Sequence, residues 1–257
     1  MVCVAAGIIF WRSTSVEPPP PQAVIVLSAK EQTVLKALLK LHLNTFAAGN
    51  ASLFTKLPEG SEYVVTSAQQ LQRDYAKDQA AADKAYLGKQ ILLRGNVTAI
   101  DPAGKRKYRL TFDGGPNPVQ PQAFIEDSHK EYLSELEGGQ EVKLACVGKP
   151  IDKGAAVVAD CLPVRHWVNS TVDKTATSIL AAANAGTSLP KFVVGSAIAA
   201  TMNLPKKSSC WVKSPKSSCT KEVSTALYQT LKGRPELQAE VAARVGSEAA
   251  SFDSLFK

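Results

Sequence analysis

The stretch AYLGKQILLRGNVTAI, residues 85–100, has the pattern of a β-strand with a glycine, Gly95, in its interior. A glycine inside a strand weakens it by roughly 0.5–1 kcal/mol relative to alanine, so the surrounding architecture must require one there. Successive side chains of a strand point to opposite faces. The face with the glycine holds Ile91, Leu93, Gly95, Val97 and Ala99, and the opposite face holds Arg94, Asn96 and Thr98.

Four more short strands are predicted after this one. They lie at 107–112, 123–125, 141–147 and 155–161, with a helical stretch at about 127–137 between the third and the fourth strand of the set. Five short strands with a helix in that position are the topology of the OB-fold, a small Greek-key barrel. The first strand of such a barrel bends to pair with both halves, and Gly95 allows the backbone to coil there without a side chain in the way.

Helices are predicted on both sides of the barrel. Ser28 and Glu31 form a capping box at the start of a helix that should end near residue 47. A second helix is predicted as a single element over residues 67–88, because its apolar residues recur at helical spacing and a glycine follows. The C-terminal third is alanine-rich and helical in pattern, and Pro235 suits the first position of its last helix.

The predicted fold class is therefore α+β, a five-stranded OB-fold β-barrel flanked by N-terminal helices and a C-terminal α-helical domain. The predicted domains are a truncated signal or membrane anchor at 1–12, a Pro-rich linker at 13–27, an N-terminal helical segment at 28–66, the OB-fold domain with its lead-in helix at 67–165, and an α-helical domain with a disulfide-stapled basic loop at 166–257.

The composition is that of an ordinary globular protein with a basic surplus. The 257 residues are 45% hydrophobic and 21% charged, and the formal net charge is +7. The surplus lies in residues 166–257, which hold eleven Lys or Arg against six Asp or Glu. This surplus is compatible with an acidic partner or an anionic lipid surface, and equally with a solvated lysine-rich surface that needs no partner.

The N-terminus and the cysteines suggest export. An apolar run over residues 2–11 precedes a proline tract at 18–21, and it is too short to span a bilayer by itself. We interpret it as an export signal or membrane anchor whose upstream residues are missing; a buried first helix or strand is the alternative. Two cysteine pairs in the body predict disulfides and a periplasmic or extracytoplasmic location, with four free thiols in the cytosol as the alternative. The predicted pairs are Cys146 with Cys161 and Cys210 with Cys219.

Neither a metal site nor a catalytic site is predicted. The sequence contains no Cys-x-x-Cys, and His42, His129 and His166 lack the spacing of metal ligands. No nucleophile elbow, zinc-protease motif or phosphate-binding loop places Ser, His or Asp on a useful turn. We therefore expect no catalytic residues, no metal and no cofactor, and a protein that is not an enzyme.

The barrel resembles a known family. The pattern Tyr86-x-Gly88-Lys89-x-Ile91-x-Leu93-x-Gly95-x-Val97-x-x-Ile100, with the helix before it and the closing Val157-Val158-x-x-Cys161, is similar to the bacterial OB-fold proteins grouped as tRNA_anti-like. The resemblance covers about residues 67–163 and consists of packing residues. It implies the OB-fold, and nucleic-acid binding by analogy with anticodon-binding domains.

A basic hairpin is the candidate ligand site. OB-folds bind single strands across their second and third strands and the adjoining loops. The candidate residues are Arg94, Lys105, Arg106, Lys107, Tyr108 and Arg109. The cations could contact phosphates and Tyr108 could stack on a base, but the strand alternation favours Tyr108 in the core, and a run of cations at a turn is usually just solvated. The expected function is a non-catalytic, exported or membrane-tethered binding module for a protein or peptide; the alternative is single-stranded nucleic-acid binding through this hairpin.

Overall fold

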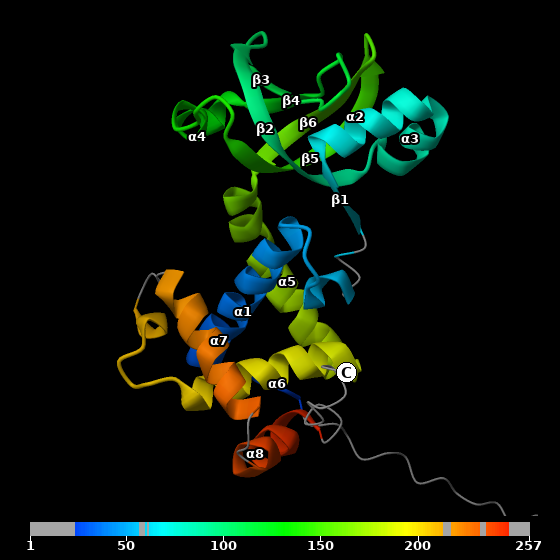
Figure 1. The fold of residues 1–257 in the computed structure, drawn as a ribbon. Coiled ribbons are helices and arrows are strands. Elements are labelled where there is room, and N and C mark those ends of the chain that lie inside the picture. The colour runs from blue at the N-terminus through cyan, green and yellow to red at the C-terminus, as the bar shows by residue number, and fades with distance from the viewer. Residues whose placement is uncertain (1–23, 57–59, 61, 213–216, 232–234, 247–257) are drawn as a thin grey trace, which may run out of the picture.

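Figure 1 shows the protein as a computed structural model, with a β-barrel at one end and a group of helices at the other. The structure describes residues 24–56, 60, 62–212, 217–231 and 235–246. The predicted signal or anchor at 1–12 and the proline tract of the predicted linker lie outside the described residues. The barrel and the helices are connected by α5 (Val164–Asn184) and by the chain between α1 (Ala29–Ala47) and β1 (Tyr63–Ser67).

The barrel has the strand order of an OB-fold. Its strands are β2 (Gln90–Pro102), β3 (Lys107–Phe112), β4 (Gln122–Glu126), β5 (Glu141–Asp152) and β6 (Ala155–Pro163). β2 pairs antiparallel with β3 and β5, β3 with β4, and β5 with β6, and the parallel pair of β4 with β6 closes the ring. The predicted fold class is confirmed. The helix expected at 127–137 is shorter, consisting of η3 (Asp127–His129) and α4 (Lys130–Ser134).

Gly95 lies where β2 changes partners. Residues 90–96 of β2 pair with β5, whereas β2 pairs with β3 from Val97 onward. A Cβ atom at Gly95 would lie 2.8 Å from the Cβ of Ala68 and 2.8 Å from Cδ1 of Phe112. Both neighbours are fully buried, so neither has room to move. The glycine allows the start of α2 (Ala68–Lys77) and the ring of Phe112 to approach the bent strand.

The inner face of β2 differs from the prediction because the strand contains a β-bulge. The pairing with β3 shifts register between Val97 and Ala99. Ala99, which was expected on the inner face, is therefore exposed, and Ile100 packs against the barrel core in its place. A bulge adds one residue to a strand and so exchanges the faces beyond it.

The segment before the barrel differs from the single helix expected over 67–88. It consists of α2 and α3 (Gln79–Tyr86), separated at Asp78, whose backbone is extended. The Asp78 carboxylate accepts a hydrogen bond from the Ala81 N–H at 3.0 Å and caps α3. β1 precedes both helices, pairs in parallel with β2, and is absent from the sequence-based prediction.

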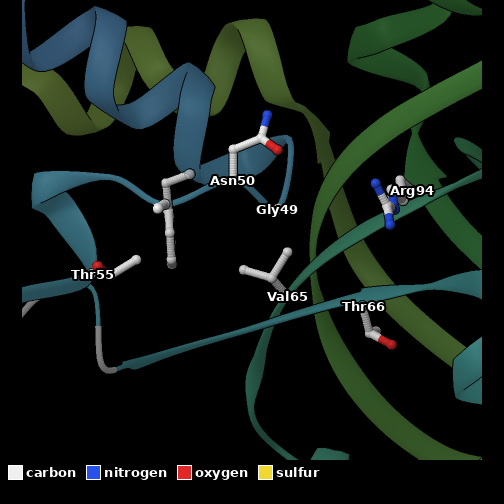
Figure 2. A pocket seen from close by; sticks show the side chains of 8 residues that line it. Gly49, Asn50, Thr55, Val65, Thr66 and Arg94 are labelled. Carbon is white, nitrogen blue, oxygen red and sulfur yellow. The ribbon is translucent and has the colours of Figure 1, made fainter.

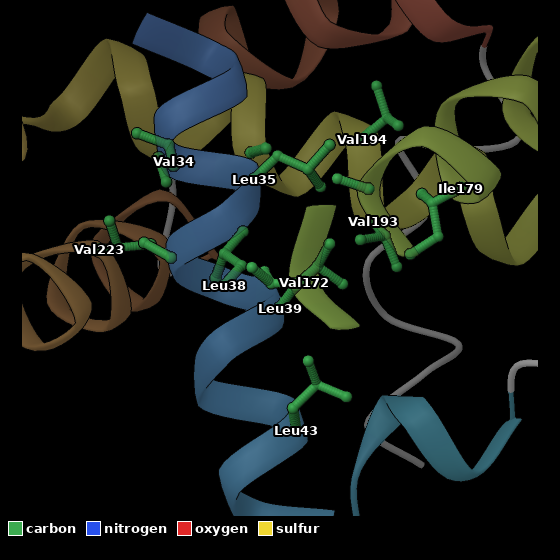
Figure 3. Close-up of a cluster of buried hydrophobic side chains, with 14 of the residues drawn as sticks. Val34, Leu35, Leu38, Leu39, Leu43, Val172, Ile179, Val193, Val194 and Val223 are labelled. Atoms are coloured by element: carbon green, nitrogen blue, oxygen red, sulfur yellow. The ribbon is translucent and has the colours of Figure 1, made fainter. Parts of the chain in front are cut away.

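The helical unit is assembled from both ends of the described chain. Besides α1 and α5, it contains η1 (Leu53–Lys56), α6 (Ser188–Asn203), η4 (Ser209–Trp211), α7 (Ser217–Leu231) and α8 (Pro235–Val245). Pro235 is the first residue of α8, as predicted. Figure 3 shows α1 side chains such as Leu35 and Leu39 packed among those of α5 and α6. The segment predicted as a separate N-terminal unit therefore shares one core with the C-terminal helices.

The end of the predicted linker at 13–27 is also part of this unit. Ile25 and Leu27 are buried. The backbone N–H of Ile25 donates to Oδ1 of Asn184 at 2.7 Å, and Arg244 of α8 donates to Glu31 of α1 at 3.1 Å. These contacts connect the first described residues to α5, and the start of α1 to the last helix.

Both predicted disulfides are present, one in each unit. Cys146–Cys161 joins β5 to β6 in the barrel core, with the Cα atoms 4.1 Å apart. Cys210–Cys219 joins η4 to α7, with the Cα atoms 4.7 Å apart, and Trp211 packs beside it against the helical core. Within the described ranges, no helix combines the length and the apolar character that a membrane span requires.

Candidate functional site

The outer face of β3 and β4 corresponds to the surface that OB-folds use for ligands, because these are the second and third barrel strands. Three residue pairs face outward across this ladder: Lys107 with Glu126, Arg109 with Phe124, and Thr111 with Gln122. All six side chains are partly exposed. The alternate residues of the same strands point inward, as Leu110 and Ile125 do.

Ion pairs give this face a mixed charge. Lys107 Nζ lies 3.3 Å from Glu126 Oε1, Arg109 Nη2 lies 3.1 Å from Asp101 Oδ2, and Lys149 Nζ lies 2.8 Å from Asp160 Oδ2. The hydrogen bond from Lys149 holds the pKa of Asp160 below its usual value, with Lys107 adding to the effect. Each of these cations has a carboxylate beside it, so the positive charge expected along the strands is largely compensated.

The tip of the β2–β3 hairpin carries the remaining candidate cations. Lys105 and Arg106 are exposed, and no ion pair involves either of them within the described part of the chain. Arg106 adopts a positive φ of 62°, and its carbonyl accepts a hydrogen bond from the Asp127 N–H at 2.8 Å. The hairpin tip is therefore attached to η3 and presents two cations to solvent.

Phe124, not Tyr108, is the aromatic residue on the outer face. Tyr108 packs against the barrel core, as the strand alternation favours. Phe124 lies opposite Arg109 on β4 and belongs to neither hydrophobic core. The sequence reasoning overlooked it, although the alternation in QAFIE, with apolar Ala123 and Ile125 on either side, would have assigned it to the outer face.

Arg94 lies far from the hairpin, so the structure does not gather the predicted ligand residues into one site. Arg94 points outward from the half of β2 nearer the helical unit. It lies eight residues before β2 ends, and eight residues of extended chain span roughly 25 Å. Its Nη1 donates to the carbonyl of Ala48, after α1, at 3.4 Å. Arg94 borders a cavity of about 390 Å³ between the helical unit and the barrel (Figure 2), which we call the seam cavity.

The described walls of the seam cavity come from five parts of the chain. Phe46 belongs to α1, Gly49 and Asn50 to the loop that follows, Thr55 to η1, Val65 to β1, and Arg94 to β2. Among the lining residues that the structure describes, Arg94 is the one with a charge. Figure 2 shows Val65 between Arg94 on one side and Asn50 and Thr55 on the other.

Two histidines that are distant in the sequence meet where the barrel joins α5. His129 Nδ1 lies 3.1 Å from His166 Nδ1, so one ring nitrogen donates a hydrogen bond to the other. Burial lowers the pKa of His129, repulsion from His166 and Arg165 adds to this, and Glu126 opposes it. Among the described residues, no three His, Cys, Asp or Glu side chains are grouped as ligands for a metal ion.

Comparisons with known proteins bear on the barrel. A family model described as tRNA_anti-like matches residues 21–162. No curated protein matches the chain. Among solved structures, the chain is similar to a lipoprotein from Klebsiella pneumoniae whose nucleic-acid binding is itself a proposal. The two sequences are 16% identical, the match covers 40% of this chain and 93% of the lipoprotein, and the TM-score is 0.35. It is also similar to a Leishmania major protein proposed to be an aspartyl-tRNA synthetase. The two sequences are 12% identical, the match covers 39% of this chain and 20% of the other, and the TM-score is 0.29.

Proposed function

Because the chain belongs to the tRNA_anti-like family, whose model matches more than half of it, we propose that the protein is a non-catalytic binding module that uses the outer face of β3 and β4. The partner that this face suits best is a protein or peptide segment. The observation that carries this proposal is the mixed charge of the face, where Arg109 and Lys107 are paired with carboxylates beside the partly exposed ring of Phe124.

A mixed-charge face with a central aromatic residue has the composition of a protein-binding surface. Aromatic residues and arginine are enriched at such interfaces, and paired charges select a partner with complementary charges. A nucleic-acid strand carries a negative charge at every phosphate, and Glu126, Asp101 and Asp160 would repel it.

Photo-crosslinking in cells of the source organism tests the proposal. A photoactivatable phenylalanine analogue at Gln122, next to Phe124, should give a discrete protein adduct that survives nuclease treatment. The yield should fall several-fold when Phe124→Ser is added. The matched control is the same probe at Lys84, which is exposed on α3. Absence of an adduct at Gln122, or the same adduct at Lys84, would contradict the proposal.

Single-stranded nucleic acid is the second candidate ligand, and the exposure of Phe124 beside Arg109 is the observation that favours it. A fluorescence titration with labelled oligothymidylate at low and physiological salt separates the two candidates. We expect weak binding that decreases steeply with salt and with Lys105→Ala and Arg106→Ala, because it would depend on phosphate contacts alone. Submicromolar binding at physiological salt that is lost in Phe124→Leu but kept in Tyr108→Leu would establish nucleic acid as the ligand.

We also propose that the protein is exported and tethered through its N-terminus, since disulfides persist in oxidising compartments. The two disulfides account for four of the five cysteines. Alkylation of the denatured, unreduced protein from cells, followed by mass spectrometry, should modify no cysteine other than Cys3. Modification of Cys146 or Cys210 in most molecules would place the protein in a reducing compartment instead.

A further inference from the structure

The seam cavity is distinct from the barrel face, and its walls come from both units of the molecule. Ligand sites occur preferentially at such junctions, and about 390 Å³ is at the small end of their range of volumes. We propose that the seam cavity binds a small carboxylate with a short apolar body, and that Arg94 holds the carboxylate.

The charge of Arg94 is not compensated within the described part of the chain. No ion pair there includes Arg94, and its hydrogen bond to the Ala48 carbonyl is long, at 3.4 Å. Lys143 lies directly opposite Arg94 on β5, and like charges at opposed positions of two strands destabilise a sheet. Lys143 Nζ lies 3.8 Å from Glu141 Oε1, so Lys143 has a carboxylate beside it. Of these two opposed cations, Arg94 is the one that has no carboxylate partner among the described residues.

One guanidinium among described lining residues that are otherwise uncharged suits a monoanion. The planar fork of an arginine side chain donates two parallel hydrogen bonds to a carboxylate. Phosphate esters carry more negative charge and are usually held by several cations or backbone N–H groups. The described residues that line the seam cavity include no second cation. The exposed amide of Asn50 lies across the cavity and provides a further donor.

The remaining walls accommodate an apolar body. Val65 and Phe46 are apolar side chains anchored in the helical core. Gly49 has a φ of 78°, and a Cβ atom there would lie 3.7 Å from Val65 Cγ1 and 3.9 Å from Arg94 Nη1. A side chain at this position would therefore occupy the space between the cation and the apolar wall, and the glycine leaves that space to a ligand.

Two sources could provide such a group, the C-terminus of a peptide or a free aliphatic acid. Three probes distinguish them: N-acetyl-alanyl-valine, its C-terminal amide, and isovalerate. Binding to the whole 257-residue chain is followed by NMR through the amide signals of Gly49 and Val65 and the side-chain Nε–H signal of Arg94. We expect saturable shifts with at least one of the two carboxylates and none with the amide.

The relative affinities identify the source. Tighter binding of the dipeptide indicates a peptide C-terminus, and equal or tighter binding of isovalerate indicates a free acid. Arg94→Gln should weaken binding at least tenfold, whereas Lys84→Gln, which removes the same charge from exposed α3, should leave it unchanged. Asn50→Asp, in an exposed loop, places a carboxylate at the rim and should also weaken binding, independently of any effect on β2.

Three results would overturn the proposal: no saturable binding of either carboxylate, equal binding of the amide, or unchanged binding in both folded variants. These results do not affect the proposal for the outer face of β3 and β4, because the crosslinking probe at Gln122 tests that surface by itself. The two proposals can therefore fail independently of each other.

Discussion

The barrel and the helical unit are constructed in different ways from one chain. The barrel strands all come from one continuous segment, Gln90 to Pro163. Most of them pair with the next strand along the chain, and the remaining pairs close the ring. The helical unit combines α1 with helices that begin more than 100 residues later, and Leu39 of α1 packs in the same core as Val194 of α6. Local sequence signals describe the first construction well and the second poorly.

The two units also meet over a narrow seam. Leu92 and Ala145 belong to barrel strands, but their side chains point outward and pack in the helical core. The rest of the barrel interior forms a separate core around residues such as Leu110 and Phe112. The molecule therefore has two hydrophobic cores that share one wall of the barrel.

The largest effect is expected from one matched truncation in each core. Leu39→Ala and Leu110→Ala each remove a fully buried side chain and should each cost about 3 kcal/mol of unfolding free energy. Because the seam is narrow, hydrogen exchange should show that each variant weakens protection mainly in its own unit. Equal loss of protection in both units for either variant would mean that the two cores unfold as one.

The disulfides offer a second comparison between the units. Cys146 and Cys161 are 15 residues apart, and Cys210 and Cys219 are 9 residues apart. A disulfide stabilises the folded protein by lowering the entropy of the unfolded chain, and the effect grows with the length of the loop. Replacing both cysteines of a pair by alanine should therefore lower the free energy of unfolding by about 3 kcal/mol in the barrel and about 2.5 kcal/mol in the helical unit. Denaturant unfolding of the two double variants measures both values, and a larger loss in the helical unit would contradict the estimate from loop length.

A third, smaller effect is expected at the bend of β2. Gly95→Val should destabilise the protein by about 2 kcal/mol, because its side chain would overlap Ala68 and Phe112. Asn96→Val, one residue further and exposed, should change the melting temperature little. If both substitutions lowered the melting temperature equally, close packing at Gly95 would not be the reason for the glycine.

The smallest effect concerns the histidine pair at the junction of the two units. The pKa of His129 is lowered in the folded protein from an ordinary value of 6.5. As the pH falls below about 6.5, the unfolded chain binds a proton that folded His129 does not, so stability decreases until the folded pKa is passed. His129→Gln should reduce this pH dependence in thermal melts from pH 7 to pH 5. The part due to half-buried His42, whose pKa desolvation also lowers, should remain. An unchanged pH dependence would show that the pair does not contribute.

The sequence alone was sufficient for the features that depend on local pattern. Strand alternation and the position of the intervening helix determined the OB topology, and the capping box of Ser28 and Glu31 determined the start of α1. The pairing of Cys146 with Cys161 followed from the same topology, since β5 and β6 are adjacent in an OB-fold. These signals are local because each depends on side-chain periodicity or on groups within one turn of the chain.

The tertiary structure decided everything that depends on contacts between distant segments. The bulge after Val97 is visible only in the pairing of β2 with β3, and it moved Ala99 outward. Arg94 was grouped with the hairpin cations by proximity in the sequence, yet the outward direction of its side chain on β2 brings it beside Ala48. His129 and His166 met because η3 and the first turn of α5 come together at the junction of the units. Such contacts follow from the closure of the whole chain around its two cores, which no short window of the sequence contains.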